Sequence, residues 1–179
     1  MKKSNKIIPF PDKKYQVIYA DPPWLVGRGP DWGSNEASRP LTYPTMSLAE
    51  IRKLPVKDIS GRNCKLFMWT INKYLGEAIT IMKEWGFKYS TTLVWCKKPN
   101  GIGLGGTFSL TTEFLLFGYR GKCGALKRYD TTWWIYKRGR HSEKPRDFRK
   151  MIANTFRGPY IELFAREHPI GWDVWGDEV

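Results

Sequence analysis

The sequence predicts an α/β fold with a mostly parallel central sheet and helices on both faces. Short apolar runs typical of strands alternate with segments whose apolar residues recur at helical spacing. Several of these runs are apolar throughout, as expected of parallel strands buried on both faces. The chain has 179 residues, of which 41% are hydrophobic, enough for one domain with its own core. We therefore predict a single domain over residues 1–179.

Four strands are expected in the first two thirds of the chain, over residues 15–20, 65–69, 87–97 and 113–119. The first strand ends abruptly at two prolines. Ser47 and Glu50 have the spacing of a capping box and predict a short helix that stops at Pro55. A second helix carries apolar residues from Leu75 to Met82, and Gly86 ends it.

The last third of the chain predicts three more strands, over residues 133–135, 160–165 and 171–175. A helix with Phe148, Met151, Ile152 and Phe156 on one face lies between the first two of these strands, with Pro145 in its first turn. In a parallel sheet the working site lies at the carboxyl ends of the strands. We expect Asp21, Glu178 and the segment after Ala165 at that edge.

The charge of the chain points to a polyanionic partner. Lys and Arg exceed Asp and Glu by 13, and Trp, Tyr and Phe each occur nine times. Basic and aromatic residues together favour nucleic acid. Residues 120–150 hold eleven Lys or Arg against three acids, a net charge of +8. We expect phosphate contacts from the cations of this region, although a solvated basic face is the alternative: Arg120, Lys122, Lys127, Arg128, Lys137, Arg138 and Arg140.

Other classes of protein are excluded by simple features. No apolar stretch approaches the roughly 20 residues of a membrane helix, and the N-terminus lacks the apolar core of a signal peptide. Three cysteines without a C-x-x-C pair fit a reducing compartment. Only two histidines are present, so a zinc site would have to gather its ligands singly from distant segments, which argues against one. We expect a cytoplasmic protein without a metal and without a membrane partner.

Asp21, Pro22, Pro23 and Trp24 follow the first strand directly and carry the strongest chemical signal. An exocyclic amine on a base is a poor nucleophile because its lone pair is conjugated into the ring. The carboxylate of Asp21 and the carbonyl of Pro22 could accept its two N–H groups and localise that lone pair. The prolines stiffen the turn, and Trp24 offers a face for stacking. The alternative is a strand exit with an incidental acid and a core tryptophan.

These residues resemble the catalytic motif of the MTA-like family of S-adenosylmethionine-dependent N(6)-adenine methyltransferases. The resemblance continues in family order along nearly the whole chain, which makes the set far more specific than one motif. The further matching elements lie at residues 43–46 (Tyr-Pro-Thr-Met), 66–69 (Leu-Phe-Met-Trp), 117–121 (Phe-Gly-Tyr-Arg-Gly), 141–145 (His-Ser-Glu-Lys-Pro), 162–166 (Glu-Leu-Phe-Ala-Arg) and 171–176 (Gly-Trp-Asp-Val-Trp-Gly).

The resemblance implies a permuted Rossmann-like methyltransferase of a bacterial cell or a phage-infected host, with S-adenosylmethionine as cofactor. It would modify the N(6) amine of adenine in DNA after the base has been flipped out of the duplex. Residues 1–14 form an arm, 15–120 the catalytic half, 121–143 a basic substrate region and 144–179 the cofactor half. RNA as the substrate, N(4)-cytosine methylation and a non-catalytic nucleic-acid-binding subunit are the alternatives. The intact motif at 21–24 counts against the last, and the acid at 21 favours adenine. A homodimer or a heteromeric partner is left open by the sequence.

The same resemblance assigns individual residues. Tyr43 and Trp24 would sandwich the adenine, and Trp133 or Trp134 would fill the gap that a flipped base leaves in duplex DNA. The alternative is that these are core aromatics. Contact with the cofactor is implied for residues at the strand ends and in the basic region: Asp21, Lys144, Glu162, Phe164, Arg166, His168, Asp177 and Glu178. For Glu162 a paired structural acid is the alternative, and for Asp177 and Glu178 a solvated tail. Asp177 stands where the family usually has an amide.

Overall fold

The computed structural model describes residues 9–25, 44–98, 107–139 and 143–176. Seven strands form one sheet in the order β5-β3-β4-β2-β1-β6-β7. The strands are β1 (Tyr15–Ala20), β2 (Ser60–Thr70), β3 (Lys88–Lys98), β4 (Thr112–Arg120), β5 (Trp133–Lys137), β6 (Tyr160–Leu163) and β7 (Trp172–Trp175). Only β4 runs opposite to the other described strands. The predicted α/β class with a mostly parallel sheet is therefore confirmed.

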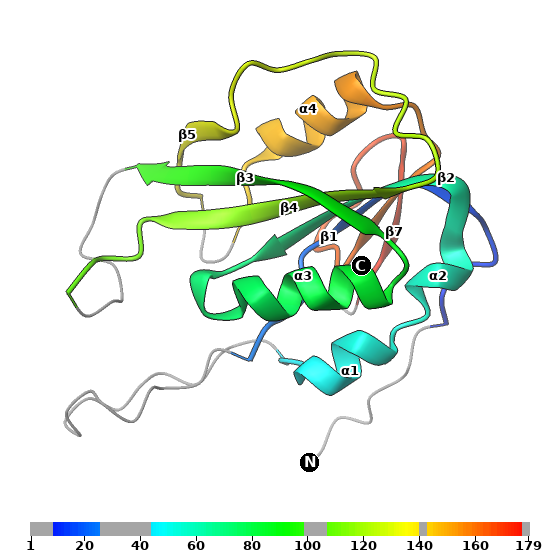
Figure 1. Ribbon diagram of the computed structural model, residues 1–179, viewed down its shortest axis with the longest axis horizontal. Helices are drawn as coiled ribbons and strands as arrows, with labels where there is room; N and C mark the ends of the chain where they lie inside the picture. The colour runs from blue at the N-terminus through cyan, green and yellow to red at the C-terminus, as the bar shows by residue number, and fades with distance from the viewer. Residues whose placement is uncertain (1–8, 26–43, 99–106, 140–142, 177–179) are drawn as a thin grey trace.

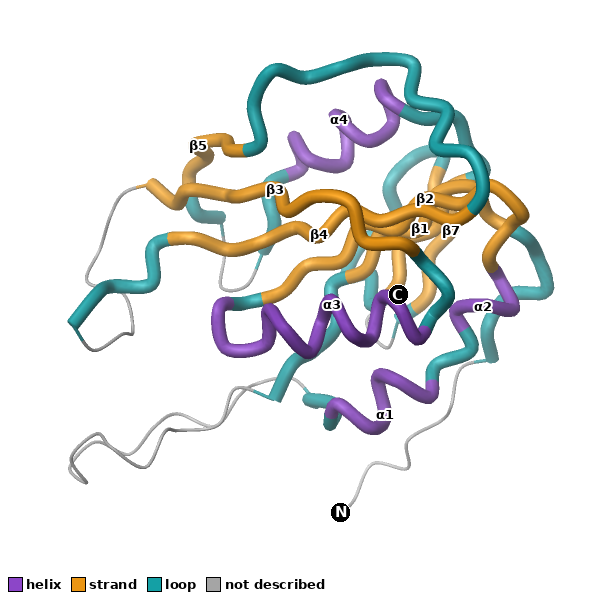
Figure 2. The backbone as a smooth tube through the Cα atoms, viewed as in Figure 1, coloured by secondary structure: helices purple, strands orange, loops and turns teal. Residues whose placement is uncertain are grey.

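Helices cover both faces of the sheet, as predicted (Figures 1 and 2). One face carries α1 (Leu48–Lys53), α2 (Val56–Ile59) and α3 (Leu75–Glu84), the last preceded by a 3-10 turn over Asn72–Tyr74. The other face carries α4 (Arg146–Thr155). Each layer has its own hydrophobic core, because successive residues of a strand point to opposite faces. Ile18 and Ala20 of β1 belong to the core under α1–α3, whereas Val17 and Tyr19 belong to the core under α4.

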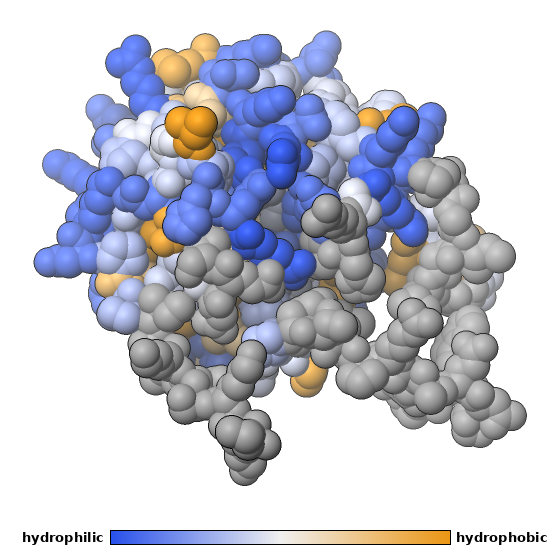
Figure 3. Space-filling view, turned by 180° about the vertical axis from the view of Figure 1, so that it is seen from behind, coloured by the Kyte–Doolittle hydropathy of each residue, from blue (hydrophilic) through white to orange (hydrophobic). Residues whose placement is uncertain are grey.

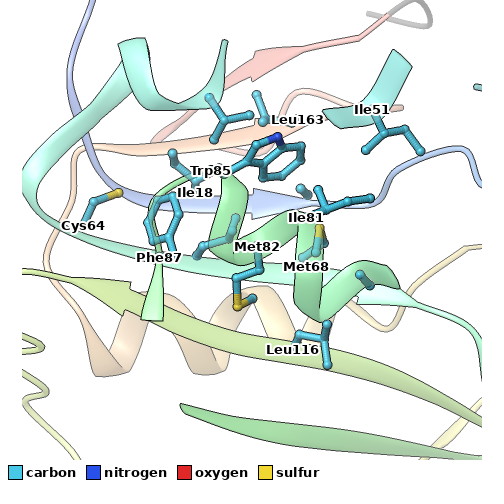
Figure 4. Packing of buried hydrophobic residues seen from close by; sticks show 14 of the residues in the cluster. Ile18, Ile51, Cys64, Met68, Ile81, Met82, Trp85, Phe87, Leu116 and Leu163 are labelled. Atoms are coloured by element: carbon cyan, nitrogen blue, oxygen red, sulfur yellow. The ribbon is translucent and has the colours of Figure 1, made fainter. Parts of the chain in front are cut away.

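The core under α3 is built from side chains that are almost fully buried. Met68 of β2 and Leu116 of β4 meet Ile81 and Met82 of α3 in this layer (Figure 4). Gly118 of β4 lies so close to α3 that an added Cβ would stand 2.5 Å from the Met82 sulfur. This close approach explains why a residue without a side chain occupies the middle of a buried strand.

Two local signals read from the sequence hold in detail. The capping box is formed, since the Ser47 hydroxyl accepts from the backbone of Glu50 and the Glu50 carboxylate accepts from the backbone of Ser47. Gly86 follows α3 with φ of 85°, a left-handed conformation that glycine adopts without strain. By contrast, β2 begins at Ser60, five residues earlier than expected, and the short helix α2 was not predicted.

The direction of the strands positions the site. The carboxyl ends of β1, β2, β3, β5, β6 and β7 lie at one edge of the sheet, and α4 begins beside it. Because β4 runs in the opposite direction, this strand begins at that same edge and ends at the far one. The edge therefore combines residues that follow six strands with residues at the start of the seventh.

Candidate active site

The turn after β1 is fixed by backbone hydrogen bonds on several sides. The Trp24 N–H donates to the Pro22 carbonyl at 2.8 Å, and the Met46 N–H donates to the Pro23 carbonyl at 2.9 Å. The Asp21 N–H donates to the carbonyl of Leu163 in β6 at 3.4 Å. Two prolines restrict the backbone further. The Asp21 carboxylate and the Pro22 carbonyl are thus held in place relative to the sheet.

Trp24 is a structural support of this turn. Its ring is only 5% exposed and stacks on Tyr74 with 5.4 Å between centroids. Its indole N–H donates to the carbonyl of Trp69 at 3.0 Å. The ring lies in the wall of the pocket described below. The structure therefore gives Trp24 a packing role, and its contact with a base stays a prediction.

A chain of four charged side chains lines the pocket beyond the turn. The Lys144 ammonium is 2.8 Å from Asp21 Oδ2 and 3.4 Å from Glu113 Oε2. The other Glu113 oxygen is 2.5 Å from the Lys97 ammonium. All four side chains are at most 21% exposed. Carboxylates and ammonium groups therefore alternate in the order Asp21, Lys144, Glu113, Lys97.

The pKa values of this network follow from burial and from the alternating charges. Burial raises the pKa of Asp21 above its usual range, although the Lys144 ammonium opposes the change. Burial alone would raise the pKa of Glu113, but Lys144 and Lys97 outweigh it and hold that pKa low. Burial would lower the pKa of Lys144, yet the two carboxylates outweigh it and raise that pKa. Lys144 and Glu113 are consequently charged at neutral pH. Of the two carboxylates, Asp21 is the more easily protonated.

We expect the acid limb of the pH profile of kcat/KM to move in opposite directions in two variants. Activity that needs the Asp21 carboxylate is present above its pKa and lost as the pH falls through it. Lys144→Gln removes the opposing cation and moves the limb to higher pH, whereas Glu113→Gln removes a neighbouring anion and moves it to lower pH. Steady-state profiles of both variants test this, with Glu84→Gln, an exposed acid paired with Arg52, as the control. If the acid limb moved in the same direction in both variants, this would contradict its assignment to Asp21.

Glu162 pairs with a cation of α4. The Arg149 guanidinium reaches its two oxygens at 2.8 and 3.1 Å, and both side chains are at most 16% exposed. Arg149 also contacts Glu167 at 2.8 Å, so it joins α4 to β6 and to the segment after β6. Burial raises the pKa of Glu162, and the Arg149 charge opposes this. The pairing agrees with the structural alternative for Glu162, and its contact with the cofactor remains untested.

Arg149→Met is expected to lower the free energy of unfolding by about 3–5 kcal/mol, because it leaves the Glu162 carboxylate buried without a partner. Arg146→Met removes a guanidinium that is 64% exposed and also contacts Glu167, so a cost below about 1 kcal/mol is expected. Urea unfolding of both variants makes the comparison. Equal losses would contradict the role of burial at Arg149.

The remaining residues predicted for the cofactor follow β6. Phe164 has φ of 62°, a left-handed conformation uncommon for a bulky residue, and its ring packs edge-on against Trp175 at 5.4 Å. This turn directs Arg166 into the lining of the pocket. His168 is exposed in the connection to β7. Tyr43, Asp177 and Glu178 lie outside the described residues.

The predicted nucleic-acid cations do not lie together. Lys137 ends β5, and Arg138 follows it with its N–H donating to the Lys98 carbonyl, so both lie at the site edge. Arg120 ends β4 at the far edge, about 27 Å away along that strand at ~3.4 Å per residue, and Lys122 follows it. Lys127 and Arg128 are exposed in the segment that crosses α4 (Figure 1). Arg140 lies outside the described residues. Any contact of these cations with nucleic acid stays a prediction.

The structure adds several residues to the pocket that the sequence did not single out. Glu113 and Lys97 carry charge, and Trp69, Thr70 and Ile71 complete the lining with the turn, Lys144 and Arg166. The cavity has a volume of about 60 Å³ and is partly open to solvent. In the sequence, Glu113 is an acid at the start of an apolar run. Its place in the site could be predicted only if the direction of β4 were known, because that direction puts the start of the strand at the site edge.

Among the described residues, no group of three or more His, Cys, Asp or Glu side chains could hold a metal ion. None of the described helices is long and apolar enough to cross a membrane.

Comparison with known proteins places this geometry in context. The family model MT-A70 matches residues 15–178. The Type II methyltransferase M.MunI of Mycoplasma sp is 36% identical over 99% of this chain and 86% of its own length. The human N(6)-adenine-specific methyltransferase METTL4 is 25% identical over 93% of this chain and 38% of its own length. The N(6)-adenosine-methyltransferase MT-A70-like protein of Drosophila melanogaster is 27% identical over 93% of this chain and 27% of its own length.

Proposed function

Because the chain belongs to the MT-A70 family, we propose that it is an S-adenosylmethionine-dependent enzyme that methylates the N(6) amine of adenine in DNA. Membership confirms the resemblance that the ordered sequence motifs predicted. The observation that carries the assignment to a site is the presence of two acceptors, the partly buried Asp21 carboxylate and the Pro22 carbonyl, in one fixed turn at the edge of the sheet.

Two acceptors in this arrangement suit an aromatic amine. Each N–H of the adenine amine would donate to one of them, which draws the nitrogen lone pair out of conjugation with the ring. The Pro22 carbonyl already accepts from Trp24 but has a second lone pair. The raised pKa of Asp21 lets its carboxylate hold the proton that the amine loses on methylation.

The charges of the pocket fit the proposed cofactor. S-adenosylmethionine, when bound, supplies a methyl group that its sulfonium has already activated. Its amino-acid end is a zwitterion, and the described lining offers two cations, Lys144 and Arg166, beside two carboxylates, Asp21 and Glu113. We assign Arg166 and Lys144 to the carboxylate end of the cofactor. The donor set of this chain therefore suits such a molecule.

Lys144 must move or share its partner when substrate enters. Its ammonium occupies Asp21 Oδ2, one of the acceptors proposed for adenine. Glu113, 3.4 Å away, offers it a second carboxylate at little electrostatic cost. The cavity of about 60 Å³ is also smaller than the roughly 300 Å³ or more of ligand pockets. We propose that Lys144 shifts toward Glu113 and thereby opens the acceptor pair.

DNA is the proposed substrate, and the proposed location is the cytoplasm of a bacterial cell or a phage-infected host. A relative that matches 99% of this chain over 86% of its own length is named as a Type II methyltransferase. RNA is the second candidate, because the Drosophila relative is named as an adenosine methyltransferase. In duplex DNA the adenine must leave the stack before its amine reaches the Asp21–Pro22 pair, at a cost of a few kcal/mol.

Labelled methyl transfer tests the substrate. Unmethylated duplex DNA and RNA of matched sequence are incubated with radiolabelled S-adenosylmethionine, and cofactor binding is measured separately by calorimetry. We expect cofactor binding and label in DNA. Label in RNA alone would overturn the choice of DNA while the chemistry stands. Absence of both label and cofactor binding would overturn the enzymatic assignment in favour of a non-catalytic subunit.

A further inference from the structure

The outermost described strand on one side of the sheet, β5, leaves an uncovered strip of side chains. Trp133 and Ile135 are 56% and 47% exposed, and Lys137 continues the same face. Trp134, by contrast, packs edge-on against Phe148 of α4 with 5.7 Å between ring centroids. Of these two adjacent tryptophans, Trp134 is thus partly buried against the core and Trp133 lies at the surface.

The strip extends onto β3 and changes character along its length. Cys96 pairs with Ile135, and Lys98 pairs with Lys137, so these side chains share the face of Trp133. Helix α3 packs against β2, β3 and β4 on this side of the sheet. The strip is therefore apolar at Trp133 and Ile135 and cationic at Lys98 and Lys137, which lie at the edge of the sheet that holds the site. We call Trp133, Ile135, Lys98 and Lys137 the β5 strip.

Register across the sheet relates the strip to the pocket. Trp133 pairs with Val94, Val94 with Phe114, and Phe114 with Thr70, which lines the pocket. Three strand spacings of about 4.8 Å place Trp133 about 14 Å from Thr70. About four stacked base steps of 3.4 Å cover this distance along duplex DNA.

Exposed aromatic and cationic groups in this combination suit one kind of partner. Aromatic faces stack on bases while Lys and Arg neutralise phosphates. On the face seen from behind, hydrophilic residues predominate and hydrophobic ones form small separate groups (Figure 3). A net charge of +13 makes a polyanion the fitting occupant.

We propose that the β5 strip binds the nucleic-acid strand that flanks the target adenine, with Trp133 stacking on an unstacked base and Lys98 and Lys137 contacting phosphates. This inference rests on the proposed function for the identity of the nucleic acid. It selects Trp133 over Trp134. It also selects the cations at the site edge over Arg120 and Lys122 at the far edge.

Fluorescence anisotropy of a labelled 30-base-pair unmethylated duplex, measured over a salt series, tests the strip. Trp133→Ala is expected to raise Kd about fivefold or more, and Trp133→Phe to keep it within about twofold, since an aromatic face remains. Lys98→Gln with Lys137→Gln is expected to reduce the slope of log K against log salt by about 2. The matched control, Lys53→Gln with Lys83→Gln, removes the same charge from exposed residues in the last turns of α1 and α3, outside the strip, and should leave the slope unchanged.

Any of three results would overturn the proposal that the β5 strip binds nucleic acid. They are an unchanged Kd in Trp133→Ala, a loss of slope in the control pair alone, or a dimer in light scattering that Trp133→Ala dissociates while Kd for DNA stays the same. The last would make a second copy of the chain the occupant. Methyl transfer by the wild type is assayed in parallel. If the wild type transfers no methyl group but the variants change DNA binding as predicted, the proposed function is overturned and the proposal for the β5 strip stands. If the wild type transfers methyl groups but the variants leave DNA binding unchanged, the proposal for the β5 strip is overturned and the proposed function stands.

Discussion

Asp21→Asn is expected to lower kcat for methyl transfer by about 10²–10³-fold or more, the usual cost of losing one preorganised electrostatic contact in a catalytic site. The change keeps the size of the side chain but removes the negative charge that Lys144 contacts at 2.8 Å and that would accept an adenine N–H. One amide oxygen is a weaker acceptor, and the amide cannot take up the proton that the amine loses. Single-turnover transfer of labelled methyl to DNA measures the effect.

Two controls distinguish chemistry from folding. Asp58→Asn removes an exposed acid of α2 and should leave kcat unchanged. Calorimetry and thermal melting of Asp21→Asn should show a folded protein that still binds S-adenosylmethionine. Activity within about threefold of the wild type in a folded, cofactor-binding variant would be incompatible with the proposed role of Asp21.

Trp24→Ala is expected to reduce the free energy of unfolding by about 3–5 kcal/mol, the range for removing a buried aromatic side chain. The ring is 5% exposed, stacks on Tyr74 and donates to the Trp69 carbonyl. Its loss leaves a cavity and an unpaired carbonyl beneath the Asp21 turn. Urea denaturation followed by circular dichroism measures this loss.

The same substitution at another tryptophan provides the matched control. Trp133 is 56% exposed, so Trp133→Ala should change stability by less than about 0.5 kcal/mol. Trp24→Phe should recover part of the loss, since the phenyl ring fills most of the space but cannot donate to Trp69. Similar stability of both alanine variants would contradict the packing role of Trp24 and favour a ring that serves only the substrate.

Much of the fold could be predicted because its signals are local. The strand before Asp21, the capping box at Ser47 and the glycine after α3 each depend on residues that are neighbours in the sequence. The edge that holds Asp21 and Arg166 followed from a general rule about parallel strands. Ordered motifs then indicated the family, which the comparison confirmed.

The rest depended on long-range geometry. Glu113 enters the site because β4 is reversed, and no local pattern encodes that direction. The same reversal carries Arg120 to the far edge, although in sequence it belongs to the basic segment. Trp133 and Trp134 are adjacent residues of the same type, and only the placement of α4 on one face of the sheet buries part of Trp134 and leaves Trp133 exposed.

The central claim, that the Asp21–Pro22 turn serves adenine N(6) methylation, is tested most directly by mass spectrometry of nucleosides. Unmethylated duplex DNA is treated with S-adenosylmethionine carrying a deuterated methyl group, and the DNA is digested after reaction with the wild type and with Asp21→Asn. The account predicts deuterated N(6)-methyladenine from the wild type and at most a trace from the variant. Deuterated N(4)-methylcytosine in its place, or equal N(6)-methyladenine from both proteins, would contradict it.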